Sequence, residues 1–204
     1  MTKTFFDRVY DIPEDGDTRQ LYAEWATSYE ADLKANGYAT PLRIAKALRR
    51  FTPDPSMPLL DYGCGTGMSG DAFATAGFTC VDGLDVTPEM LDVARDKGIY
   101  RNVLLADPDT PPPVSAESYP MIAAVGVIGV GAAPLSVFDD IMHLLPMGGL
   151  FAFSFNDHAL ERPEYEAKLN EWLDTAAARL KMREHGPHIA ALDLGANVYV
   201  LEKA

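Results

Sequence analysis

Glycines recur at alternate positions behind an acidic residue in the segment 59–70, which reads L-L-D-Y-G-C-G-T-G-M-S-G. An apolar run ends in Asp61, and Gly63, Gly65 and Gly67 follow it. Glycine adopts positive φ readily and carries no Cβ, so such a loop lets the backbone pass close beneath a ligand. The spacing therefore predicts a loop, between a strand and a helix, that binds a nucleoside.

Two kinds of nucleoside loop share this spacing. The pattern D-x-G-x-G-x-G, from Asp61 to Gly67, is similar to the S-adenosylmethionine loop of class I methyltransferases. The pattern G-x-G-x-x-G, from Gly65 to Gly70, is the fingerprint of dinucleotide-binding proteins. Asp61 favours the first alternative, because a carboxylate at the mouth of the loop would repel a pyrophosphate docking on the helix N-terminus.

The elements that must position this loop alternate between strands and helices. Strands are predicted at 57–62, 78–84, 102–106, 121–127 and 150–155. Helices are predicted at 67–76, 134–145 and 163–182, with a further one opening at Thr87-Pro88. Two apolar runs, 189–194 and 198–201, predict a closing hairpin. This order predicts an α/β fold with a doubly wound, mostly parallel sheet and an antiparallel edge strand.

Two helices are predicted ahead of the first strand. One spans 17–33 and carries an apolar stripe at steps of four residues, formed by Leu21, Trp25, Tyr29 and Leu33; the other opens at Thr40-Pro41. We expect a single domain, 1–204, in which a helical cap (1–56) precedes an α/β core (57–204). The stripe is expected to cover the carboxyl edge of the sheet.

Three acids fall at the ends of the first three predicted strands: Asp61, Asp85 and Asp107. The carboxyl ends of parallel strands meet at one edge of a sheet, and ligands of such folds bind there. The acids and the glycine loop therefore predict one shared binding site.

From Leu59 to Asn156 the chain closely resembles class I S-adenosylmethionine-dependent methyltransferases. The segments that carry the resemblance are L-L-D-Y-G-C-G-T-G, G-L-D-V-T-P-E-M-L, L-L-A-D and L-P-M-G-G. The N-terminal segments V-Y-D, L-Y-A-E-W-A-T-S-Y-E-A-D-L and G-Y-A-T-P are similar to the methyltransferase-like subgroup named after the Williams–Beuren syndrome region. The resemblance implies a Rossmann-like, seven-stranded sheet and S-adenosyl-L-methionine as cofactor.

The resemblance also implies roles for individual residues. Asp61 would face the amino group of the cofactor above a floor made by Gly63, Cys64, Gly65 and Gly67. Asp85 would accept hydrogen bonds from both ribose hydroxyls, since a carboxylate has two oxygens for two donors. The remaining implied contacts are with the adenine (Val86, Met90, Ala106, Asp107), the sulfonium end (Val125, Gly126) and, as a closing lid, Tyr29.

Several of these residues have plainer explanations. Asp85 could cap the helix that opens near Pro88, and Asp107 could set a turn before Pro108. Cys64 is expected to be a small filler rather than a nucleophile, and Tyr29 could be ordinary packing. His158, after the fifth strand, is either a surface residue, which we favour, or a general base.

Composition restricts the acceptor. The formal net charge is −13 and the longest basic cluster is Arg49-Arg50, so a DNA or RNA substrate is not expected. No membrane span, signal peptide, disulfide framework or metal site is expected, and we anticipate a cytoplasmic protein. The oligomeric state is left open.

The sequence thus predicts methyl transfer from S-adenosylmethionine to a small molecule or, less favoured, a protein. The Asn/Asp-Pro-Pro-aromatic signature of enzymes that methylate planar amino nitrogens is absent after the fourth strand. The histidine pair that many relatives carry there is replaced by Gly129-Val130. Two alternatives stay open, a nicotinamide-dependent oxidoreductase and a non-catalytic S-adenosylmethionine-binding protein.

Overall fold

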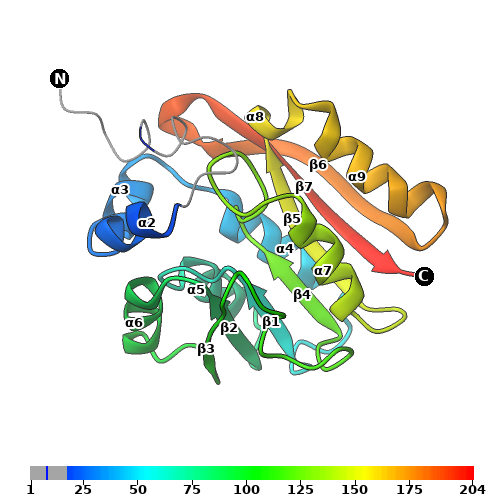
Figure 1. Ribbon diagram of the computed structural model, residues 1–204, viewed down its shortest axis with the longest axis horizontal. Coiled ribbons are helices and arrows are strands. Elements are labelled where there is room, and N and C mark those ends of the chain that lie inside the picture. Colours follow the sequence, from blue (N-terminus) through cyan, green and yellow to red (C-terminus); the bar gives the residue numbers. More distant parts are fainter. Residues whose placement is uncertain (1–7, 9–17) are drawn as a thin grey trace.

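The computed structural model describes residue 8 and residues 18–204, and within them a single sheet organises the fold (Figure 1). Its strand order is β3-β2-β1-β4-β5-β7-β6. The first five strands are parallel: β1 (Leu59–Tyr62), β2 (Val81–Asp85), β3 (Val103–Leu105), β4 (Met121–Ala124) and β5 (Leu150–Asn156). The last two, β6 (Ala178–Ile189) and β7 (Leu194–Lys203), form an antiparallel hairpin beside β5. The predicted doubly wound, mostly parallel seven-stranded sheet is confirmed.

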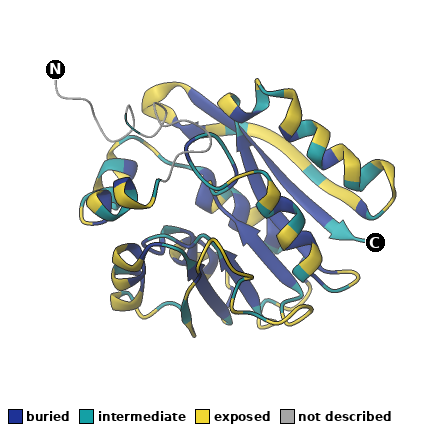
Figure 2. Ribbon diagram, viewed as in Figure 1, coloured by how far each residue is buried: buried dark blue, intermediate teal, exposed yellow. Residues whose placement is uncertain are grey.

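Helices cover both faces of the sheet because neighbouring strand residues point to opposite sides. Leu59 packs in the layer of α4 (Thr40–Phe51) and α5 (Met68–Thr75). Leu60 packs in the layer of α7 (Ser136–Leu144) and α9 (Pro163–Asp174). Figure 2 shows the central strands buried, whereas β6 is exposed along most of its length.

The N-terminal stripe lies on two helices rather than one. The helices are α2 (Arg19–Trp25) and α3 (Tyr29–Ala35), so the prediction of a continuous helix over 17–33 is wrong. The turn between them is fixed by Asp32, whose Oδ2 accepts from the Trp25 indole nitrogen at 2.7 Å and from the Ser28 hydroxyl at 3.0 Å. Residues 1–7 and 9–17, at the start of the predicted 1–56 cap, lie outside the described residues.

The C-terminal elements also differ from the prediction. The helix predicted over 163–182 ends at Asp174, and Ala176 adopts a positive φ of 56° before β6 begins. The hairpin turns at Asp193, with φ of 51°, rather than at 194–197. Ala178 and Leu180 fit a strand alternation as well as a helical stripe, which is why an apolar pattern alone misassigned them.

The remaining elements lie around the carboxyl ends of the strands. α6 (Pro88–Asp96) follows β2 and contacts α2. A short α8 (Asp157–Leu160) follows β5, and a 3-10 turn (Ala190–Leu192) joins β6 to β7. None of the described helices is long and apolar enough to cross a membrane.

Candidate functional site

A cavity of about 890 Å³, the large cavity, opens where the parallel strands end. This volume is in the range of sites that hold a complete small-molecule ligand. Its walls come from the segments that follow β1, β2, β3 and β4, and from α2 and α3. The carboxyl edge of the sheet and the N-terminal helices therefore enclose one space, as the sequence predicts.

Ten of the thirteen residues implied by the resemblance line the large cavity: Tyr29, Gly63, Gly65, Asp85, Val86, Met90, Ala106, Asp107, Val125 and Gly126. The other three, Asp61, Cys64 and Gly67, do not line it. The structure thus divides the glycine motif into a face that borders the cavity and a face that packs on the core.

Two glycines of the loop are required for different physical reasons. Gly65 has φ of 52°, and a Cβ built on it would meet no atom within 4 Å. That side of Gly65 is open space beside the cavity, where a ligand can approach the backbone. At Gly63, with φ of 76°, a Cβ would lie 2.4 Å from Val127 Cγ2, so the contact that excludes a side chain there is with the protein itself.

A buried hydrogen-bond network supports the loop from behind. Asp61 is fully buried, and its Oδ2 accepts from the Ser69 hydroxyl and the Tyr100 hydroxyl, each at 2.6 Å. Its Oδ1 has no partner among the described residues. Burial raises the pKa of Asp61 to about 7, although both hydrogen bonds oppose this shift. Asp61 therefore anchors the loop in this structure and does not border the cavity.

Tyr100 is a site-supporting residue that sequence reasoning missed. Its ring lies where a Cβ on Gly67 or Gly70 would be, and its hydroxyl accepts from Gly70 N at 3.1 Å. The third glycine of G-x-G-x-x-G is thus explained by packing against an aromatic ring. Cys64 is a buried filler whose Sγ lies against Gly83, and burial raises the pKa of its thiol.

Asp85 is not the N-cap of α6, which is Thr87, but it fixes the turn ahead of that helix and also borders the cavity. Its Oδ1 accepts from Thr87 N at 2.9 Å, ahead of α6, and its Oδ2 accepts from Gly65 N at 2.9 Å. Burial raises the pKa of Asp85, and the backbone donors oppose that shift. A carboxylate has about four lone-pair sites, so a ligand can share this acceptor with the backbone donors. Asp85 therefore couples the glycine loop to α6 across the binding space.

The far end of the large cavity is mixed in character. Asp107 is exposed, and its Oδ1 accepts from Asp109 N at 3.0 Å, so it does set a turn as well as line the cavity. Met90 and Ala106 are buried and apolar beside it. This end offers apolar surface next to a carboxylate, a combination that suits an aromatic ring with an exocyclic donor.

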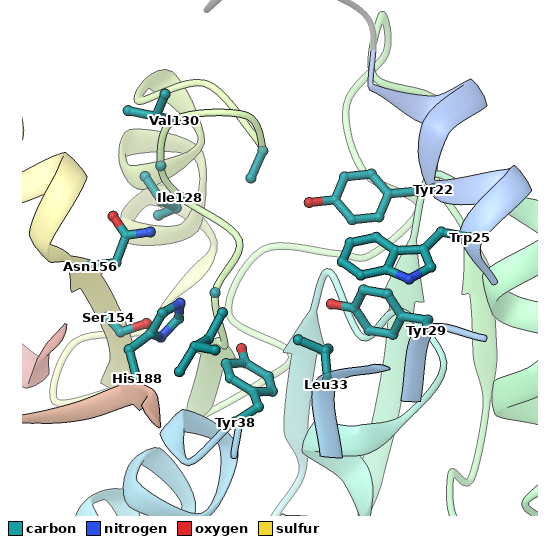
Figure 3. Close-up of a pocket in the computed structure, with 14 residues that line it drawn as sticks. Tyr22, Trp25, Tyr29, Leu33, Tyr38, Ile128, Val130, Ser154, Asn156 and His188 are labelled. Carbon is teal, nitrogen blue, oxygen red and sulfur yellow. The ribbon is translucent and has the colours of Figure 1, made fainter. Parts of the chain in front are cut away.

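A second, smaller space of about 70 Å³, the inner pocket, adjoins the large cavity (Figure 3). The two share four wall residues: Tyr22, Tyr29, Gly126 and Ala132. On one side of the inner pocket stand Tyr22, Trp25 and Tyr29 from α2 and α3; on the other stand Ser154, Asn156 and His188 from β5 and β6. The inner pocket is reached past Gly126, directly after β4.

His158 is a surface residue, as the sequence analysis favours, and two other histidines border the site. His158 is exposed on α8 and lines neither space. His188, which the sequence analysis did not single out, lines the inner pocket, and burial lowers its pKa to about 4. His143 lines the large cavity. Among the described residues no group of three or more His, Cys, Asp or Glu could hold a metal ion.

Ion pairs fasten the N-terminal helices to the core beside the glycine loop. Glu30, next to Tyr29, contacts Lys97 at the end of α6 and Lys34 on its own helix. Lys97 also pairs with Asp71 of α5 at 2.6 Å. Burial alone would raise the pKa of Glu30, but the two lysines hold it below its ordinary value. The helical cap is thus fastened to α5 and α6 on the side of the site that carries the glycine loop.

Comparison with known proteins agrees with this geometry. The methyltransferase domain family matches residues 36–197. Human methyltransferase-like protein 27 is 27% identical over 169 residues, which cover 81% of this chain and 68% of the relative. The 18S rRNA (guanine-N(7))-methyltransferase of Mus musculus is 47% identical over 49 residues, only 24% of this chain and 17% of that protein.

The fold recurs in solved structures. A TehB-like S-adenosylmethionine-dependent methyltransferase from Corynebacterium glutamicum has a TM-score of 0.60 at 17% identity, covering 91% of this chain and 100% of that one. At this identity the likeness concerns the fold alone. Family match, fold and strand-end site agree, and the chain belongs to the methyltransferase domain family as a class I S-adenosylmethionine-dependent methyltransferase.

Proposed function

We propose that the large cavity binds S-adenosylmethionine and that the enzyme transfers its methyl group to a small-molecule acceptor. The observation that carries the proposal is the space beside Gly65: it is open, it borders a carboxylate at Asp85, and it continues into a second pocket past Gly126. A cofactor and an acceptor can therefore meet end to end.

The wall residues fit the parts of the cofactor in order. Asp85 is proposed to accept from the ribose hydroxyls with the lone pairs that Gly65 and Thr87 leave unused. Val86 and Met90 are proposed to flank the adenine, with Asp107 accepting from its amino group and Ala106 beside it. Val125 and Gly126 are proposed to lie beneath the sulfonium end.

The loop itself is proposed to carry the methionyl part. Gly65 allows close backbone approach, while Gly67 and Cys64 keep the loop packed on Tyr100 and Gly83. Contact between Asp61 and the amino group of the cofactor stays a prediction. In this structure the unpartnered Oδ1 of Asp61 is enclosed, so such a contact requires a path through the loop.

Positioning is the main task of the protein in this reaction. Bound S-adenosylmethionine supplies a methyl group that its sulfonium already activates. The chain's own residues then align the two reactants, which can account for much of the barrier reduction. Tyr22 and Tyr29, which border both spaces, are proposed to exclude water at the junction.

A small-molecule acceptor is favoured by charge and by enclosure. The net charge of −13 opposes the phosphate contacts on which nucleic-acid binding rests. The mouse rRNA methyltransferase matches only 24% of this chain, so it does not carry an RNA acceptor over to it. The inner pocket is small and recessed, which suits the end of a small molecule better than a flat macromolecular surface.

Of the two alternatives left by the sequence, one loses its support and the other does not. Membership of a methyltransferase family removes the support for a nicotinamide-dependent oxidoreductase, and Tyr100 explains Gly70 without a pyrophosphate. A protein that binds the cofactor without turnover remains a distinct outcome, because cofactor and acceptor sites are separate.

Two measurements on the same preparation test the proposal. Calorimetry should give saturable binding of S-adenosylhomocysteine and none of NAD. Incubation with S-adenosylmethionine labelled in the methyl group, together with a fractionated metabolite extract, should place label in a low-mass fraction. Label in RNA or protein fractions alone would contradict the small-molecule acceptor, and binding without any transfer would favour the non-catalytic alternative.

A further inference from the structure

The inner pocket presents fixed hydrogen-bond donors that the protein leaves unused. Asn156 caps α8, and its Oδ1 accepts from Ala159 N at 3.0 Å. This contact fixes the orientation of the amide, because the oxygen must face the helix. The Nδ2 group is left without a partner among residues 18–204, and in Figure 3 it points toward the pocket interior.

His188 supplies a second donor. Its Nδ1 lies 2.7 Å from the hydroxyl of Thr40, a side chain with 0% exposure. The Thr40 hydroxyl hydrogen has no other acceptor among the described residues, so Thr40 donates and Nδ1 accepts. The ring is then neutral with its proton on Nε2. The low pKa of His188, about 4, keeps this form at neutral pH.

The pocket is uncharged. Its described wall contains no Asp, Glu, Lys or Arg. A cationic group would find no carboxylate, and an anionic group no cation, so burying either here would be costly. The tyrosines of α2 and α3 do not form an aromatic cage, because the hydroxyl ends of Tyr22 and Tyr29 point toward the side where Asn156 and His188 lie (Figure 3).

We propose that the inner pocket binds the carbonyl oxygen of an uncharged small-molecule acceptor, with Asn156 Nδ2 and His188 Nε2 as its donors. Ser154, buried on the same side, can donate from its hydroxyl to the same oxygen. The proposal rests on methyl transfer in the adjoining large cavity. The acceptor atom that is methylated then lies near Gly126, while its carbonyl is held deeper in the pocket.

The experiment uses three probes with one ring: benzamide, benzylammonium and benzoate. They are titrated by ligand-observed NMR into protein saturated with S-adenosylhomocysteine and into the ligand-free protein. Benzamide should bind at least about tenfold more tightly than either charged probe, since wrong pairing of a buried donor costs that much or more. Equal or tighter binding of benzylammonium or benzoate would overturn the proposal.

Asn156→Asp is the discriminating variant. Its carboxylate can still accept from Ala159 N, so the cap of α8 is retained while the donor becomes an acceptor. Benzamide binding should weaken about tenfold and benzylammonium binding should strengthen. Asn170→Asp, on the exposed side of α9, makes the same charge change and should alter neither. An unchanged probe order in Asn156→Asp contradicts the assignment.

Two further outcomes separate the possible failures. If Asn156→Asp melts at a much lower temperature, Asn156→Ser keeps a capping hydroxyl and should weaken benzamide alone. If the wild-type protein does not bind S-adenosylhomocysteine, the proposed function is wrong. The relative affinities of the three probes for the ligand-free protein then still test the inner pocket by themselves. Tight binding of a guanosine-containing RNA hairpin, with no probe bound, would assign the pocket to a nucleic acid and overturn the proposal.

Discussion

The two halves of the site are built in different ways. The large cavity takes many of its wall residues from a loop and strand ends close together in sequence, from Gly63 to Asp107. The inner pocket combines Tyr22 with Asn156 and His188, both of which lie more than a hundred residues further along the chain. We propose that the first half binds the cofactor and that the second half binds the acceptor.

Because the two spaces are built mostly from different residues, substitutions in one should change cofactor binding and substitutions in the other should change acceptor binding. Changes around the glycine loop should reduce affinity for S-adenosylhomocysteine, and changes around the inner pocket should leave it intact. Glu30 and Lys97 join the helical cap to the end of α6 and line neither space, so their substitution should affect binding only slightly. Four predictions follow this order of effect.

The largest effect is expected from Gly65→Leu. The side chain would enter the open space beside the loop, so S-adenosylhomocysteine binding should fall by more than about a hundredfold in calorimetry. The positive φ should cost only about 1–2 kcal/mol of stability. Gly98→Leu is the matched control, since Gly98 also has positive φ with nothing within 4 Å but lies outside both spaces. Similar affinities for the two variants would contradict the cavity assignment.

Asp85→Ala should weaken S-adenosylhomocysteine about ten- to a hundredfold, because a charged hydrogen-bond partner contributes about 1.5–3 kcal/mol. The backbone donors of Gly65 and Thr87 also lose their acceptor, so the melting temperature should fall. Asp107→Ala, which removes an exposed carboxylate, should weaken binding by less. If Asp85→Ala lowers the melting temperature without changing affinity, Asp85 only fixes the turn ahead of α6.

The buried carboxyl group of Asp61 should make the free energy of unfolding of the protein depend on pH. Its pKa is raised to about 7 in the folded protein, against about 3.9 in an unfolded chain. The folded state therefore binds more protons between these values, and the free energy of unfolding should fall as pH rises from about 4 to about 7. Asp61→Asn should lack this decline in urea titrations across that range. Parallel pH profiles for the two proteins would contradict the raised pKa.

The smallest effect is expected at the ion pair between Glu30 and Lys97, which joins the helical cap to the end of α6. Glu30 and Lys97 retain 20% and 19% exposed side chains, so their coupling should be about 1 kcal/mol or less. A double-mutant cycle of Glu30→Gln and Lys97→Met measures it directly. S-adenosylhomocysteine affinity should change by no more than about threefold. A larger change would mean that this ion pair sets the position of the helical cap over the large cavity.

Most of the residues that the sequence singled out line the large cavity, because their signals are local. Glycines at fixed spacing and acids at strand ends identify a binding edge without any knowledge of distant contacts. Tyr100 was missed because its role depends on where the chain returns beneath Gly67 and Gly70. The single-domain organisation stays a prediction.

The inner pocket could not be predicted in the same way. A stripe at steps of four does not reveal the break that Asp32 fixes between α2 and α3. The helix predicted through 182 hid the strand that carries His188 into the pocket. The donor character of Asn156 appears only when its oxygen is seen to cap α8.

A crystal structure of the protein with S-adenosylhomocysteine tests the central claim most directly. We expect the ribose hydroxyls on Asp85, the sulfur atom beside Gly126 facing the inner pocket, and Tyr29 within contact distance of the homocysteine part. A ligand whose sulfur faces away from the inner pocket, with Tyr29 more than one layer of side chains distant, would contradict it.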